Sequence, residues 1–207
     1  MNVPAANAPV APPRPVRLGA VSRGFLANRR GRSLYHALHG DTASPDEVWV
    51  FCPPLLEEAT FANRPLVLLA ETLANAGATV MRFDYEGQGE SEGDARSLGL
   101  EEWADDTVSV IGWLRERFGS AVRVNLLSLR GGAFVAAHAA VRSMARVDRL
   151  VLLAPTLDGA KYFDECLRAH LTTQLGCFNK VEQPRAVLRG QLHRGQAVSV
   201  LGHDVGQ

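Results

Sequence analysis

Residues 79–91 read TVMRFDYEGQGES, and this stretch decides the fold. Its first part, Thr79–Phe83, is a short apolar run that predicts a buried strand. The rest follows the pattern D-x-x-G-x-G-x-S from Asp84 to Ser91. Its two glycines permit a tight loop with positive backbone dihedral angles, and the Asp84 and Ser91 side chains can bond to the loop backbone. We predict a strand followed by a structural loop that leads into a helix.

Strands and helices alternate on both sides of this stretch. Further strands are predicted at 48–51, 122–127 and 149–153, helices at 65–76, 100–118 and 132–144, and a hairpin at 24–38. Such alternation predicts right-handed βαβ crossovers and a parallel sheet. Ligands bind beyond the carboxyl ends of parallel strands, so the loops after Phe51, Phe83, Leu127 and Leu153 are the places where a site is expected.

The two ends of the chain differ from this pattern. Residues 1–17 hold five of the eleven prolines and predict a disordered tail rich in proline and alanine. Residues 18–207 are predicted to form a single domain. Within it, helices at 159–175 and 184–192 make residues 158–195 a helical, cap-like segment, and a strand-like run follows at 197–201.

Composition excludes several classes of function. Lys+Arg and Asp+Glu both number 22, which argues against a nucleic-acid partner. No run reaches 18 apolar residues, so no membrane span is expected, and the N-terminus lacks the apolar stretch of a signal peptide. The three cysteines have no metal-ligand spacing and fit a reduced compartment. We expect a cytoplasmic protein without a metal or cofactor.

The loop after residues 122–127 reads SLRGGA, residues 128–133. A strand, a sharp turn of the form small-x-nucleophile-x-small and a helix make the nucleophile elbow of hydrolases. The register with small residues at Ser128 and Gly132 puts Arg130 at the apex. Arginine stays protonated and is no nucleophile. The other register makes Ser128 the candidate catalytic residue, but then bulky Leu126 and Arg130 flank it.

Arg130 and the loop after Phe51 are candidates for substrate binding. At a helix N-terminus, Arg130 could bind a carboxylate or phosphate through two hydrogen bonds. Alternatively, it pairs with a neighbouring acid, Glu57 or Glu58. Two prolines in the loop lack amide donors, which leaves the amides of Leu55 and Leu56 to face the crevice as an oxyanion hole would.

A complete catalytic triad is not identified in the sequence. The histidines beyond the elbow are His170, His193 and His203, and none stands where the usual topology would return it to the elbow. Asp158 and Asp164 are equally unsupported as the acid that orients a histidine.

Together these motifs resemble the α/β-hydrolase superfamily, and within it the second type of hydrolase associated with bacterial exosortase A systems. The resemblance covers about residues 46–204 and is carried by Pro53-Pro54, Glu57-Glu58, Asp84–Ser91 with Gly93, Trp103, Asp106, Leu129-Arg130, Gly132, Ala154-Pro155, Gly159 and Gly202. It implies an α/β fold with a mostly parallel sheet flanked by helices, and a context near exopolysaccharide synthesis. The chain departs from the group at Leu55, where phenylalanine is usual, and at Ser128, where glycine is usual.

The resemblance leaves two functional hypotheses. The first is an ester or thioester hydrolase with an incomplete triad, acting on a small acyl or ester ligand. The second is a non-catalytic hydrolase-fold protein that binds a ligand or partner through Arg130. Members of the group run on for several tens of residues, so the C-terminal strands are expected to be missing here. A shortened sheet would expose an unpaired edge, through which two copies could form a homodimer.

Overall fold

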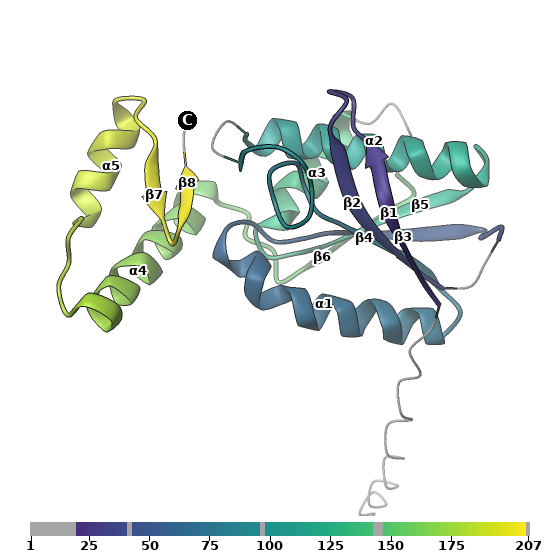
Figure 1. Ribbon diagram of the computed structural model, residues 1–207, viewed down its shortest axis with the longest axis horizontal. Coiled ribbons are helices and arrows are strands. Elements are labelled where there is room, and N and C mark those ends of the chain that lie inside the picture. The colour runs from purple at the N-terminus through teal and green to yellow at the C-terminus, as the bar shows by residue number, and fades with distance from the viewer. Residues whose placement is uncertain (1–19, 41–42, 96–97, 143–146, 206–207) are drawn as a thin grey trace, which may run out of the picture.

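In the part of the chain that the structure describes, the main sheet has six strands. The computed structural model describes residues 20–40, 43–95, 98–142 and 147–205, so the tail predicted at 1–17 lies outside the described residues. Within those ranges the order is β1-β2-β4-β3-β5-β6 (Figure 1). The strands β3, β4, β5 and β6 are parallel, whereas β1 and β2 form the antiparallel end. Their bounds are Val21–Ala27, Ser33–His39, Glu47–Cys52, Thr79–Phe83, Arg123–Leu129 and Arg149–Leu153 for β1 to β6.

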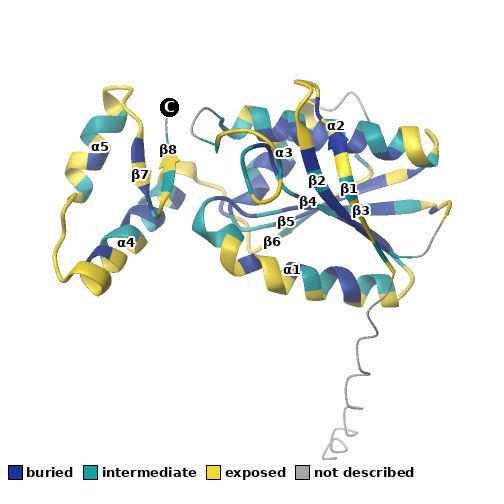
Figure 2. Ribbon diagram, viewed as in Figure 1, coloured by how far each residue is buried: buried dark blue, intermediate teal, exposed yellow. Residues whose placement is uncertain are grey.

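Helices cover both faces of this sheet, as the predicted α/β fold requires. Helix α1 (Glu57–Asn75) lies on one face, and α2 (Leu100–Phe118) and α3 (Gly132–Arg142) lie on the other (Figure 1). Successive side chains of a strand point to opposite faces, so each face has its own core. Under α1 the buried side chains are Phe51, Ala62, Leu66, Ala70, Val80 and Leu127, and the cluster that includes the α2/α3 side has more members. Figure 2 colours much of the main sheet as buried.

Several predicted boundaries match the structure, and one does not. The strands predicted at 79–83 and 149–153 and the helix predicted at 100–118 agree with β4, β6 and α2. Helix α1, however, begins at Glu57, eight residues before the predicted start, and contains Pro65. Ala62 is the one buried residue in its first two turns, so no apolar stripe marks them in the sequence. Pro65 is exposed, and water can reach the carbonyl that its missing N–H leaves without a donor.

The segment after β6 forms a separate layer beside the main sheet (Figure 1). It contains α4 (Gly159–Phe178) and α5 (Arg185–His193), close to the predicted helices, and the strands β7 (Val198–Val200) and β8 (His203–Val205). The two strands pair antiparallel as a small hairpin of their own. No helix in the described ranges is long and apolar enough to span a membrane.

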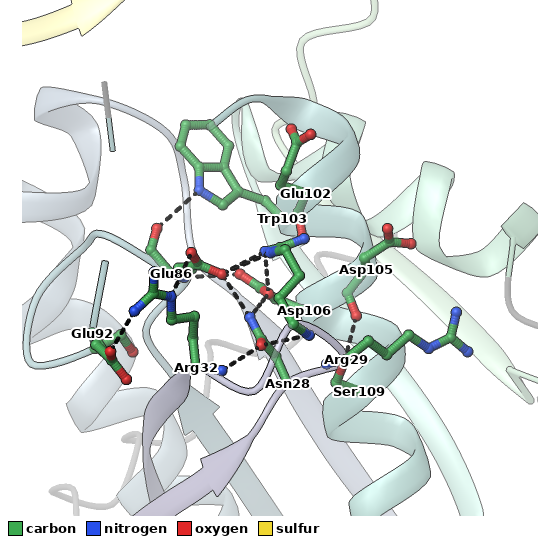
Figure 3. A network of polar contacts seen from close by, with 12 residues as sticks. Asn28, Arg29, Arg32, Glu86, Glu92, Glu102, Trp103, Asp105, Asp106 and Ser109 are labelled. Atoms are coloured by element: carbon green, nitrogen blue, oxygen red, sulfur yellow. Dashed lines mark hydrogen bonds and ion pairs between the residues drawn. The ribbon is translucent and has the colours of Figure 1, made fainter. Parts of the chain in front are cut away.

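A buried polar network holds the loop after β4 in place (Figure 3). The Asn28 side-chain amide, from the end of the β1–β2 hairpin, donates to Glu86 at 2.7 Å and to Asp106 of α2 at 2.8 Å. Arg30 donates to the same two carboxylates at 2.8 and 2.9 Å. Burial raises the pKa of Asp106, against the hydrogen bonds and the Arg30 charge that lower it. Buried carboxylates are stable only when paired in this way, so hairpin, loop and helix are fixed relative to one another.

The loop itself is tied as the sequence predicts. The Ser91 hydroxyl donates to the Asp84 carbonyl at 2.7 Å, and the Asp84 carboxylate accepts from the Glu90 amide at 3.0 Å. Gly89 and Gly87 have positive φ, and a side chain at Gly89 would collide with Asp84. The prediction of a structural loop is confirmed.

Candidate functional site

The turn after β5 has the geometry of a nucleophile elbow. Strand β5 ends at Leu129 and α3 begins at Gly132, so two residues make the turn. Arg130 stands at its apex with a φ of 51°, in the left-handed region that side chains rarely adopt. The Arg130 amide donates to the Leu153 carbonyl at 3.0 Å, and a Cβ on Gly132 would lie 2.4 Å from the Pro53 carbonyl oxygen. The strained turn is therefore held between the ends of β6 and β3.

Ser128 lies below this turn, inside the sheet. It is a residue of β5, opposite Cys52 of β3 and Leu152 of β6. Its exposed fraction is 0%, and its hydroxyl forms no hydrogen bond with the described residues. The Ser128 side chain shares a sheet face with Leu126 in the α2/α3 core, so the candidate nucleophile does not reach the surface of the crevice.

Arg130 joins two acidic side chains from different helices. Its Nε donates to Glu58 Oε1 of α1 at 3.0 Å, and its terminal nitrogen donates to Glu165 Oε2 of α4, also at 3.0 Å. Hydrogen bonds with Glu165 and Glu58 raise the pKa of Arg130 above its usual value. Of the two acids weighed from the sequence, Glu58 forms the pair, and Glu165 is an additional partner. About 38% of the Arg130 side chain remains exposed.

The loop after β3 brings Leu55 and Leu56 beside the elbow. Leu55 is buried, and its carbonyl accepts a hydrogen bond from the Tyr162 hydroxyl of α4 at 3.1 Å. Leu56 has a φ of 55° and precedes the first turn of α1. The Tyr162 ring also packs on the elbow, since a Cβ on Gly131 would lie 2.8 Å from it. Helix α4 therefore contacts both the loop and the turn.

Two hollows border this loop. The smaller, of about 220 Å³, contains Arg130, and the larger, of about 580 Å³, lies between α1 and the loop after β4. Leu56 lines both. The smaller hollow has charged groups at Glu57, Glu58, Arg130 and Glu165, and apolar or weakly polar groups at Leu56, Phe61, Cys166, Ala169 and Leu201. It can therefore take a ligand with one charged end and one apolar end.

Comparison with known proteins establishes the family. The model of the Hydrolase_4 family, described as serine aminopeptidase S33, matches residues 45–200. The chain belongs to this family. The predicted α/β-hydrolase superfamily is thereby confirmed, and so is the fold class. No curated protein matches this Hydrolase_4 member.

Solved structures of α/β hydrolases resemble this Hydrolase_4 member. The serine hydrolase XC6422 from Xanthomonas campestris, described as without a lid, is 26% identical with a TM-score of 0.54, over 69% of this chain and 64% of that one. A serine hydrolase homologue from Coxiella burnetii is 20% identical with a TM-score of 0.55, over 70% and 68%. Est1E from Butyrivibrio proteoclasticus, with ferulic acid bound, is 22% identical with a TM-score of 0.53, over 70% and 56%. The chain thus spans less than two thirds of the length of the Xanthomonas protein.

The histidines and acids considered for a triad have other partners or positions in this Hydrolase_4 member. His170 of α4 accepts a hydrogen bond from the Leu201 amide at 3.1 Å, His193 ends α5, and His203 of β8 lines the larger hollow. Asp158 caps α4 by accepting from the Lys161 amide, and Asp164 pairs with Arg189. No histidine or acid in the described ranges bonds to the Ser128 hydroxyl.

Two of the three cysteines, Cys52 and Cys166, are buried. Burial raises the pKa of Cys52 to about 12 and that of Cys166 to about 11, so both stay thiols near neutral pH. Cys177 is exposed and unpaired. No group of three His, Cys, Asp or Glu side chains in the described part of the chain could hold a metal ion.

Sequence reasoning missed the contribution of α4. Tyr162 and Glu165 stand on a helix that was predicted for its apolar face alone. Glu165 lies between Asp164 and Cys166 without a motif around it, and its partner Arg130 is 35 positions away. No local signal in the sequence could have joined them.

Proposed function

We propose that this protein binds a small acyl ligand in the crevice beside Arg130 and does not hydrolyse it at the elbow. The observation that carries the proposal is the guanidinium at the apex of the turn, with the Ser128 hydroxyl buried beneath it. A guanidinium stays protonated and is no nucleophile, but it is a strong donor to carboxylates. Apolar walls next to Arg130 suit the acyl chain.

The proposal is tested by labelling and binding on the same preparation. A fluorophosphonate probe, which reacts with activated serines, is expected not to label the protein. Isothermal titration calorimetry with hexanoate is expected to show binding, which Arg130→Ala abolishes. Arg168→Ala is the matched control, because Arg168 is an exposed arginine of α4 and does not line the hollow. Equal hexanoate binding by Arg130→Ala and the native protein would refute the assignment.

Ester or thioester hydrolysis through Ser128 is the second candidate function. It is supported by the serine-hydrolase family and by the unsatisfied Ser128 hydroxyl, since a buried hydroxyl without a partner is costly and often has a functional reason. This function requires the elbow to rearrange so that the hydroxyl meets the crevice. Fluorophosphonate labelling that is lost in Ser128→Ala, together with p-nitrophenyl butyrate hydrolysis, would replace the first proposal by this one.

The cellular setting is proposed from the resemblance to exosortase-associated hydrolases. We place the protein in the cytoplasm, near exopolysaccharide synthesis, as a single domain from residue 18 in which residues 158–195 act as a cap over the elbow. The contacts of Tyr162 and Glu165 with the elbow support the cap. Fractionation of cells with an antibody, and the genes beside this one, test the setting.

A homodimer through the sheet edge is proposed as the form in solution. Strand β6 pairs with β5 on one side, and within the described sheet no strand pairs with its other side. Leu150 and Leu153 on this edge are exposed, and such an edge is a template for a second copy. Analytical ultracentrifugation is expected to show a dimer that Leu150→Lys converts to a monomer.

A further inference from the structure

We infer that Glu165 occupies the place of the ligand's own carboxylate on Arg130, so that a carboxylic acid binds by displacing it. This inference rests on the proposed function and names its ligand class, a short apolar carboxylic acid. The Glu165 carboxylate lies 3.0 Å from the Arg130 terminal nitrogen, the distance of a charge-assisted hydrogen bond. A ligand carboxylate in the same position would make the same bond.

The two glutamates on Arg130 are held in different ways. Glu58 stands in the first turn of α1, a helix fixed to the sheet by Ala62, Leu66 and Ala70, and it also lies 3.2 Å from the Tyr162 hydroxyl. Within the described ranges, the Glu165 carboxylate hydrogen-bonds to Arg130 alone. Releasing Glu165 from Arg130 therefore breaks fewer contacts than releasing Glu58 would.

The attachment of α4 permits this exchange. The residues between β6 and α4 are exposed apart from Thr156. Tyr162 anchors α4 to the loop after β3, and the rest of the helix packs with α5 and β7 through Leu167, Leu188, Val198 and Val200, so the exchange needs only the Glu165 side chain to move. About 34% of the Glu165 side chain is exposed, so water can solvate the carboxylate once it is released. An exposed ion pair of this kind contributes little free energy to stability. A ligand carboxylate can therefore compete with Glu165 for Arg130.

The hollow beside the pair fits the rest of the ligand. Phe61, Ala169 and Leu201 line it next to the charged groups, and its volume of about 220 Å³ suits a chain of a few carbons. When the ligand carboxylate replaces that of Glu165, Arg130 keeps two carboxylates and its charge stays compensated. A neutral amide of the same length has no negative charge to take the place of the Glu165 carboxylate on Arg130. The site therefore distinguishes acids from amides.

The test compares hexanoate with hexanamide in titration calorimetry against the native protein, Glu165→Gln and Glu57→Gln. Glu57 lines the same hollow, but it is not among the acids bonded to Arg130, so Glu57→Gln is the control for charge alone. We expect Glu165→Gln to bind hexanoate about three- to tenfold more tightly than the native protein, and Glu57→Gln to change it less than about twofold. Hexanamide binding should not differ between variants. In the native protein, hexanoate should also speed amide exchange in α4.

Each outcome decides the inference. If Glu165→Gln binds hexanoate no better than the native protein or than Glu57→Gln, while Arg130→Ala still abolishes binding, the inference fails and the proposed function stands. If neither the native protein nor Glu165→Gln binds hexanoate, both fail. Circular dichroism spectra identical to that of the native protein show that each variant is folded.

Discussion

Replacing Gly132 with alanine is expected to destabilise the protein through a collision at the elbow. The new Cβ would lie 2.4 Å from the Pro53 carbonyl oxygen and 2.7 Å from that of Cys52. Cβ atoms essentially never come within 3.0 Å of such an atom, so α3 and the loop after β3 would have to separate by at least about 0.6 Å. Both groups are backbone and have no rotamer by which to escape. Overpacking of this kind costs roughly 1–3 kcal/mol of unfolding free energy.

Urea denaturation followed by tryptophan fluorescence measures this cost. With a urea dependence of about 2 kcal/mol per molar, the midpoint of Gly132→Ala should fall by roughly 0.5–1.5 M. Gly112→Ala is the matched control, because Gly112 lies inside α2 with nothing within 4 Å of an added Cβ. Alanine is the better helix former, so the control should raise the unfolding free energy by up to about 1 kcal/mol. A Gly132→Ala midpoint equal to or above that of the native protein would refute the close packing of the elbow.

Three further changes have outcomes that the structure determines. Asn28→Ala removes an amide that two buried carboxylates share, so the unfolding free energy in urea should fall by about 2–4 kcal/mol; a loss below about 1 kcal/mol would contradict the network. Burial first, and then the Arg82 charge, lower the pKa of His39 to about 4. The unfolded chain therefore binds a proton near its ordinary pKa of 6.5 while the folded protein does not, and stability should fall as the pH drops from about 6.5 to about 4. Urea midpoints across this range should fall less steeply in His39→Gln. Tyr162→Phe removes the hydroxyl that joins α4 to the Leu55 carbonyl, and should cost about 0.5–1.5 kcal/mol and speed amide exchange in α4; unchanged exchange would show that the contact does not hold the helix.

Elements with local signals could be predicted from the sequence. Strand β4 is a short apolar run that ends just before Asp84, and α2 lies between Gly99 and Gly119, so the residues themselves mark where both elements begin and end. The apex position of Arg130 followed from the need for a small residue at Gly132, which the structure explains by the backbone of Pro53. In each of these cases the signal stands in a short stretch of neighbouring residues, and the prediction was sufficient even where the cause is a distant contact.

The missed features depend on contacts over long sequence distances. The first two turns of α1 carry few buried groups, and their helical form depends on packing at the crevice rather than on an apolar stripe. The contribution of Glu165 depends on how α4 returns over the elbow, which periodicity does not determine. Strand β7 lies within the strand-like run predicted at 197–201, but β8 was missed for a related reason, because it is three residues long and His203 and Asp204 are not strand formers.

The polar network around Asn28 also constrains the order in which the chain folds. Asn28 meets Glu86 across 58 positions and Asp106 across 78. During synthesis from the N-terminus, the β1–β2 hairpin leaves the ribosome well before α2, and its amide and guanidinium groups lack their full set of partners until Asp106 of α2 has followed. Closing such long loops is slow because their entropy is lost before the contacts form. The antiparallel end of the sheet should therefore gain amide protection together with α2, as one late cooperative step of refolding.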